Sequence, residues 1–347
     1  MNAEKLLEKY AIGERDFSGI DLSWANLKQV DLRAADFWEA DLSDANLSHS
    51  NLAGTSFKAA SLTRTNLAAT NLTAADLRST DLSDATLHGA NLQSALYDRT
   101  TQFPVGFGSA IASAYLIAPQ SVLQRAILAQ TDLSGVDLSY ADLRSANLQQ
   151  ANLFGASLSH ANLSIANLQN VDLHEADLLK ANLSGANLSH AKLTYASLHY
   201  ADLSSAVLTH TDFTGANLWK ANLFGTDLRT AILHAANLQG AVYDSRTQFP
   251  ADYNPEQDGA YLIAPNVSLQ GADLHGVTLT GADLTGADLT KANLSAVDFW
   301  GANLTNANLW GANLTKTTLT DAILTDTILQ AADLTDAILD GTGLTES

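Results

Sequence analysis

A leucine recurs at every fifth position along most of the chain, and the residues around it repeat as well. In the stretch 141–165 each unit consists of a small residue, an Asp or Asn (Ser in one unit), a Leu and two variable residues. We number the Leu position 0, so that the small residue is −2, the Asp or Asn is −1, and the variable residues are +1 and +2. The unit continues almost to both ends of the chain, with Phe replacing Leu at a few positions. The sequence is therefore predicted to form one repeat protein.

A period of five excludes the regular elements. On an α-helix successive Leu residues would be rotated by about 140° and would form no apolar stripe. On a straight strand they would face opposite sides in turn, because five is odd. The pattern works if the chain turns a corner once per unit, with positions −2 and 0 inside. Four such sides close a coil of twenty residues, and coils stack about 4.8 Å apart, which predicts an all-β, quadrilateral parallel β-helix.

These A-(D/N)-L-x-x units resemble those of the pentapeptide-repeat family. The resemblance implies a right-handed coil, since the family folds as a right-handed quadrilateral β-helix. The period is interrupted twice by similar segments that begin Y-D-R-T-T-Q-F-P at Tyr97 and Y-D-S-R-T-Q-F-P at Tyr243. Inserts of the form Y-D-x-R-T-x-F-P resemble those in cyanobacterial members of the family.

We predict a single solenoid domain over 1–347, with repeat blocks at 17–96, 123–242 and 269–347. Enlarged coils are expected at 97–122 and 243–268, with outward loops near Phe103 and Phe249. They are either a duplicated structural joint or a pair of binding loops. A short α-helix over 2–11, with Asn2 as its N-cap, is expected to cap the exposed core at the N-terminal end.

The outward positions carry an acidic character. In the first block two adjacent −1 columns are rich in Asp: Asp16, Asp36 and Asp76, and Asp21, Asp41 and Asp81. The formal net charge of −19 argues against direct binding to nucleic acid or to an anionic membrane. Two interpretations remain for the columns. The carboxylates either cap N–H groups of local turns, or they form a DNA-like surface that occupies a basic protein.

One face of the second block differs from this acidic background. Its +2 positions, twenty residues apart, are expected to line up as a ladder, with Trp219 at the edge: Tyr140, His160, Lys180, Tyr200 and Lys220. Aromatic and cationic side chains together are typical of interface anchors. We therefore predict a partner-binding stripe made of these six outward-facing residues, although a variable surface without a function would also fit.

The C-terminal end has a different character. Its outward −1 positions become apolar at Ile323, Ile328 and Ile338, and no helix follows to cover the core. We predict that these three residues form a collar for self-association, which would give a homodimer through the C-terminal end.

No catalytic, cofactor-binding or metal-binding residues are predicted. The sequence lacks a phosphate loop and a nucleophile elbow. The stacked His190 and His210 have no third ligand beside them. The chain has no Cys and no apolar run of membrane-spanning length, which favours a cytoplasmic protein without a membrane partner.

Three functions are compatible with these features. The first is a non-enzymatic scaffold or regulator that binds an unidentified protein partner. The second is an acidic DNA mimic that binds a type II topoisomerase or another DNA-binding protein, as the family resemblance implies. The third is a passive structural spacer.

Overall fold

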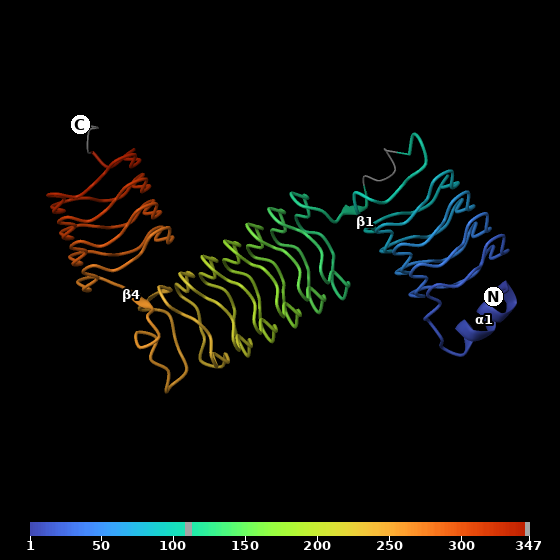
Figure 1. Ribbon diagram of the computed structural model, residues 1–347, viewed down its shortest axis with the longest axis horizontal. Helices are drawn as coiled ribbons and strands as arrows, with labels where there is room; N and C mark the ends of the chain where they lie inside the picture. Colours follow the sequence, from blue (N-terminus) through green and yellow to red (C-terminus); the bar gives the residue numbers. More distant parts are fainter. Residues whose placement is uncertain (108–112, 344–347) are drawn as a thin grey trace. The chain divides into compact units, whose positions relative to one another are not determined.

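The computed structural model describes residues 1–107 and 113–343, which form two compact units, 1–126 and 127–347. Each unit is a stack of coils (Figure 1), and the two are described separately. The prediction of one solenoid domain over the whole chain stays a prediction.

The backbone follows the predicted coil. Parallel bridges join −1 positions twenty residues apart, such as Asp16 with Asp36 and Asn162 with Asn182. Between coils, most position 0 amides donate to the carbonyl of a −1 residue in the next coil, as Leu183 N does to Asp202 O at 2.7 Å. The all-β, parallel β-helical architecture with a coil of twenty is therefore confirmed. Its right-handedness stays a prediction.

The core consists of positions 0 and −2, as the period predicts. The residues at position 0 are almost all fully buried, and the rings of Phe17, Phe37 and Phe57 stack with centroids 5.6 Å apart. Where Thr replaces Ala at −2, its hydroxyl has a partner inside the core, since Thr65 Oγ1 donates to Leu42 O at 2.8 Å. A small residue that satisfies its own hydroxyl is thus accepted beside the axis.

Each corner is a β-turn. Leu183 O accepts the amide of Ala186 at 2.9 Å, and the third residue of this turn, Gly185, has a φ of 64°. A left-handed residue at this place is the mark of a type II turn. Most +2 residues share it, including Lys180 at 53° and Tyr200 at 56°. Position +2 therefore projects from a fixed corner.

The −1 side chain stabilises the same corner. Asn182 Oδ1 accepts the amide of Ser184 at 3.0 Å, and Asp16 Oδ1 accepts the amide of Ser18 at 3.0 Å. The hydroxyl and amide of Ser18 together lower the pKa of Asp16. The acidic columns thus have the turn-capping role that was one of the two interpretations.

Helix α1 (Ala3–Ala11) begins at the predicted N-cap, because Asn2 Oδ1 accepts the amide of Lys5. It lies beside the first coil of its unit (Figure 1), where Leu6 is fully buried in the core of the first block. Tyr10 also packs there and donates to Arg33 O at 2.9 Å. That the helix serves as an end cap remains our interpretation of these contacts.

Both interruptions contain a short parallel strand pair with the same register shift. Strand β1 (Leu96–Tyr97) pairs with β2 (Tyr115–Leu116), and β3 (Val242–Asp244) pairs with β4 (Tyr261–Ile263). In each pair the partners are nineteen residues apart, for example Leu96 with Tyr115. The coil is therefore one residue short at these strands. Asp81 with Gln102 and Asp227 with Gln248 are instead twenty-one residues apart, so one additional residue follows β1 and one follows β3.

The outward loops predicted near Phe103 and Phe249 stay a prediction, and residues that follow each Phe, such as Val105 and Asp252, are exposed. The two Phe rings themselves turn inward. Phe103 packs against the core of the first block and forms an edge contact with the Tyr97 ring, with centroids 5.6 Å apart. Phe249 forms the same contact with Tyr243 at 5.3 Å. The aromatic ring, being apolar, turns inward to cover the core where the regular coil is lost.

The residues common to both interruptions have structural partners. Asp98 accepts the amide of Ser79, and Asp244 accepts the amide of Gly225, each at 3.0 Å. The hydroxyl of Thr247 donates to Leu223 O at 2.8 Å, and Thr101 makes the equivalent bond to Leu77 O. These contacts favour a duplicated structural joint over a pair of binding loops.

Candidate interface on the 127–242 coils

The aromatic–basic stripe, by which we mean Tyr140, His160, Lys180, Tyr200, Trp219 and Lys220, lies on consecutive corners of one face. Five of these residues occupy the left-handed turn position, with φ between 53° and 60°. Trp219 is at +1 of the corner that Lys220 completes. Because each corner lies one coil beyond the last, the side chains can touch their neighbours along the stack.

A pair of aromatic rings is in contact at each end of the stripe. Tyr140 stacks on His160, with centroids 4.6 Å apart and planes 4° from parallel. Tyr200 meets Trp219 edge to face at 5.0 Å. Between these pairs, Lys180 Nζ lies 5.6 Å from the centroid of the Tyr200 ring. The predicted ladder is thus present as a row of neighbouring side chains.

The exposure of the stripe is not uniform. The Tyr140 side chain is 58% exposed and Lys180 is also exposed, whereas His160, Tyr200 and Trp219 are half-buried. The outward half of the stripe therefore runs from Tyr140 to Lys180, and its other end is partly covered.

The prediction that Lys220 faces outward is wrong. Its side chain is only 3% exposed, and Nζ donates to Asp273 Oδ2 at 2.8 Å and to His275 O at 3.2 Å. Its Nζ also lies 5.0 Å from the Trp219 ring. Lys220 therefore connects the second block to the first coil of the third block and is unavailable to a partner.

Two glycines make room for this contact. A Cβ on Gly240 would lie 2.9 Å from Lys220 Cγ, and one on Gly276 would lie 3.3 Å from the Tyr200 ring. Partial burial pushes the pKa of Asp273 upward, but the hydrogen bonds from Lys220 and from the His275 amide bring it below its usual value. The contact thus keeps Asp273 ionised beside the buried ammonium.

Another aromatic cluster, which the sequence analysis missed, lies on a different column of the same block. Phe154 stacks with His174 at 5.5 Å, and His174 meets Tyr195 edge to face at 5.7 Å. Phe154 is 44% and Tyr195 63% exposed. The available signal was the pairing of Phe154 and His174 at +1, twenty residues apart. Both clusters enlarge the aromatic surface of the second block.

The predicted collar residues are exposed, as expected of −1 positions. Ile323, Ile328 and Ile338 pair with Asn303, Asn308 and Thr318, which belong to three different columns. The position 0 leucines of the last described coils are only partly buried. Among the described residues, these leucines are therefore less buried than the position 0 leucines in the middle of the third block.

The histidine pair has the geometry of a ring stack, since His190 and His210 have centroids 5.0 Å apart. Within 1–107 and 113–343, no group of three or more His, Cys, Asp or Glu side chains is placed to hold a metal ion. In the same residues, no helix has the length and apolar character needed to cross a bilayer.

Comparison with solved structures finds several pentapeptide-repeat proteins. The protein alr5209 from Nostoc PCC 7120 is 41% identical over 33% of this chain and 95% of its own, with a TM-score of 0.33. HetL from Nostoc sp. strain PCC 7120, involved in heterocyst differentiation regulation, is 27% identical over 100% of both chains, with a TM-score of 0.23. Rfr23 from Cyanothece 51142 is 23% identical over 47% of this chain and 90% of its own, with a TM-score of 0.15.

No curated protein matches the chain significantly. A family model does, and it covers most of the sequence in these segments: 16–52, 40–78, 60–96, 120–155, 151–189, 180–209, 211–242, 266–301 and 302–341. These segments span the first two repeat blocks and the third up to residue 341, and they leave out 97–119 and 243–265 within the two interruptions. The model describes pentapeptide repeats, and the chain belongs to the pentapeptide-repeat family.

Proposed function

We propose that the protein is a non-enzymatic, cytoplasmic scaffold that binds a protein partner through the outward half of the aromatic–basic stripe. The observation that carries this proposal is the row of Tyr140, His160 and Lys180 on neighbouring corners, with Tyr140 stacked on His160 at 4.6 Å. Stacked rings are rigid, so little side-chain entropy is lost when a partner covers them. Lys180 adds a cation to the surface of a chain with a formal net charge of −19.

The half-buried end of the stripe, Tyr200 and Trp219, has a different role in the proposed interface. Tyr200 and Trp219 cover Lys220, so their aromatic faces are partly occupied within the molecule. We propose that they support the stripe, and that Tyr140 and Lys180 make the direct contacts. This division follows from exposure, because a contact residue has to lose solvent-accessible area on binding.

The test is a partner pull-down followed by affinity measurements on variants. Tyr140→Ala is expected to weaken partner binding by about 1–2 kcal/mol, or roughly five- to thirtyfold in Kd, because it removes an anchor ring and its stack. Thermal unfolding should be nearly unchanged, since the ring is outside the core.

The matched control lies on the opposite face. Gln149 and Gln169 also form a coil-to-coil pair, with Nε2 and Oε1 3.4 Å apart. Gln149→Ala should leave the affinity unchanged. Equal losses for Tyr140→Ala and Gln149→Ala, or no loss for either, would contradict a role for the stripe.

The second candidate function, an acidic DNA mimic, is favoured by one observation. Asp16, Asp21 and Asp41 are exposed on two adjacent columns, and each uses Oδ1 for its turn. The other carboxylate oxygen of each is free of this role, so the turn-capping function and a charged surface are compatible. Salt-sensitive inhibition of a type II topoisomerase in a supercoiling assay would favour this candidate over the scaffold.

We also propose that the collar mediates self-association with a second copy of the chain. Changing Ile323, Ile328 and Ile338 together to Asn restores the usual −1 residue and is expected to shift a dimer toward monomer. Light scattering across the micromolar range measures this shift. Val207→Asn, an exposed apolar −1 residue on the second block, is the control and should leave the mass unchanged. A parent protein that is monomeric at high micromolar concentration argues against the collar.

A further inference from the structure

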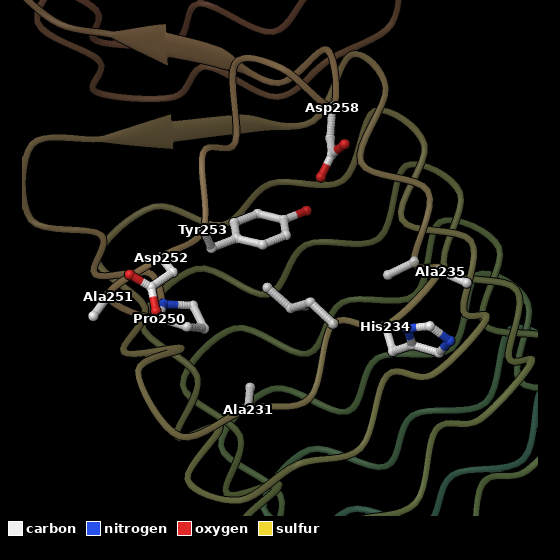
Figure 2. Close-up of a pocket in the computed structure, with 10 residues that line it drawn as sticks. Ala231, His234, Ala235, Pro250, Ala251, Asp252, Tyr253 and Asp258 are labelled. Carbon is white, nitrogen blue, oxygen red and sulfur yellow. The ribbon is translucent and has the colours of Figure 1, made fainter.

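A pocket of ≈ 550 Å³ lies at the second interruption, where the last regular coil of the second block meets the segment 250–258 (Figure 2). Ala231, Leu233 and Ala236 form its apolar wall from the coil side. Its other side is formed mainly by Pro250, Asp252, Tyr253 and Asp258. The pocket thus combines an aliphatic wall with polar groups of the irregular segment.

The pocket exists because the ladder of rungs is interrupted here. Asp227 pairs with Gln248 and Val242 with Tyr261, whereas Ile232, between them, has a rung only to Asp212 of the coil before, within the described residues. A full coil over Ile232 would have covered Leu233. Segment 250–258 covers it only in part, and the uncovered part is the cavity.

The segment that forms the roof is held by specific contacts. The Phe249 ring is between the rings of Tyr243 and Tyr253, with centroids at 5.3 and 5.6 Å. Tyr253 N donates to Pro250 O at 3.0 Å, and Tyr243 Oη donates to Glu256 Oε1 at 3.2 Å. The pocket is therefore built into the joint.

The Tyr253 hydroxyl is the unusual group of this pocket. Its oxygen is buried and has no hydrogen-bond partner. Figure 2 shows the hydroxyl directed toward the space between Asp258 and Ala235. Burial, and then the nearby Asp258 carboxylate, raise the pKa of this hydroxyl, although no hydrogen bond of regular geometry joins the two. An unsatisfied buried polar atom is destabilising, and a ligand that donates a hydrogen bond to it would remove that penalty.

The charges around the pocket select the ligand. Asp252 and Asp258 are the charged side chains of its lining, and the lining residues include no Lys or Arg. A carboxylate or phosphate ligand would be repelled by both. A cation with N–H donors can bond to the Tyr253 oxygen and the Asp258 carboxylate at once, and an aliphatic stem would bury apolar area against Leu233.

We propose that this pocket binds an ammonium or guanidinium group carried on a short aliphatic stem. The group comes either from a Lys or Arg side chain of a partner protein or from a small free amine. Both sources present the same chemistry to Tyr253, Asp258 and Leu233. This site is separate from the stripe and stands independently of the scaffold proposal.

The experiment compares n-butylammonium, butyrate and 1-butanol by ligand-observed NMR at physiological salt. Butylammonium is expected to bind about tenfold more tightly than either isostere, since only it supplies N–H donors to a carboxylate. Asp258→Asn should weaken butylammonium binding about tenfold, and Tyr253→Phe should weaken it by a smaller factor. Nonspecific attraction of butylammonium by the net negative charge of the chain would produce neither of these two losses of affinity.

Asp283→Asn is the matched control, because Asp283 is exposed on the third block and the change removes the same charge. It should leave binding unchanged. Butyrate binding as tightly as butylammonium, or equal losses in Asp258→Asn and Asp283→Asn, would overturn the proposal. A capped Ala-Lys-Ala peptide distinguishes the sources: tighter binding than butylammonium indicates a partner's side chain, and weaker binding indicates a free amine.

Discussion

Replacing Leu183 by Ala is expected to lower the free energy of unfolding by about 2–5 kcal/mol. Leu183 is at position 0 in the middle of the second block, with no exposed area, and Leu163 and Leu203 occupy the same column one coil away on either side. The backbone on both sides is fixed by rungs such as Asn162 with Asn182 and Asn182 with Asp202. The cavity therefore cannot collapse, because the coil spacing is set by the backbone hydrogen bonds.

A chemically identical change outside the core provides the control. Leu179 is at +1 of the preceding corner and is only partly buried. Leu179→Ala should therefore cost less than about 1 kcal/mol. Denaturant unfolding followed by circular dichroism measures both variants. Similar losses for the two would mean that positions 0 and +1 have been assigned to the wrong sides of the coil.

Replacing the small −2 residue Ala181 by a larger one, such as Leu, tests the other inward position. Ala181 at −2 has no exposed area, and its carbonyl accepts the amide of Asp202 at 2.9 Å. A larger side chain there would overpack the axis, in line with the rarity of large residues at −2. The core volume thus requires a large side chain at position 0 and a small one at position −2.

The regular coils could be predicted because each unit repeats the same local choices. The small −2 residue, the −1 turn cap and the position 0 Leu agree on one conformation, so a wrong register would misplace every unit at once. The Asn2 N-cap was predictable for a similar reason, since a cap acts within three residues of sequence. In these regions the local sequence pattern is sufficient to determine the local structure.

The interruptions could not be predicted to the same depth. Their length suggested coils with outward loops, but the register depends on how Tyr97 and Phe103 pack, which is a tertiary property. The fate of Lys220 depends on Asp273, which is 53 residues away across a break in the period. The twenty-residue period cannot be used to align residues across such a break. For the same reason, the pocket that contains Tyr253 could not be predicted from the sequence.

The ion pair at this joint is asymmetric. The Lys220 side chain is 3% exposed, whereas the Asp273 side chain is 57% exposed. An exposed carboxylate that loses its partner is hydrated by solvent, so it costs little. A buried ammonium that loses its partner has no such compensation. Removing the two charges is therefore expected to have unequal consequences.

Asp273→Asn is expected to lower the local free energy of opening at the joint by about 3 kcal/mol. It removes the negative charge beside the buried Lys220 ammonium, and because His275 N and Asn293 Nδ2 already donate to Oδ1, the new amide NH2 takes the place of Oδ2 against Lys220. Lys220→Met retains the aliphatic stem beneath Tyr200 and Trp219 and removes the buried charge. It should cost about 1 kcal/mol or less. The double variant should resemble Lys220→Met alone, since the second change then has no ammonium to strand.

Hydrogen–deuterium exchange of peptides covering 273–285 measures this opening locally, which suits a repeat protein whose coils need not unfold together. Asp273→Asn should accelerate exchange there about a hundredfold, and Lys220→Met by about fivefold or less. The control is Asp142→Asn, which changes the partner of an exposed Arg144 in the same unit and should leave 273–285 unaffected. If Lys220→Met accelerated exchange as much as Asp273→Asn, the joint would depend on the attraction between the charges. Equal, additive losses from both changes would likewise rule out the stranded ammonium as the cause.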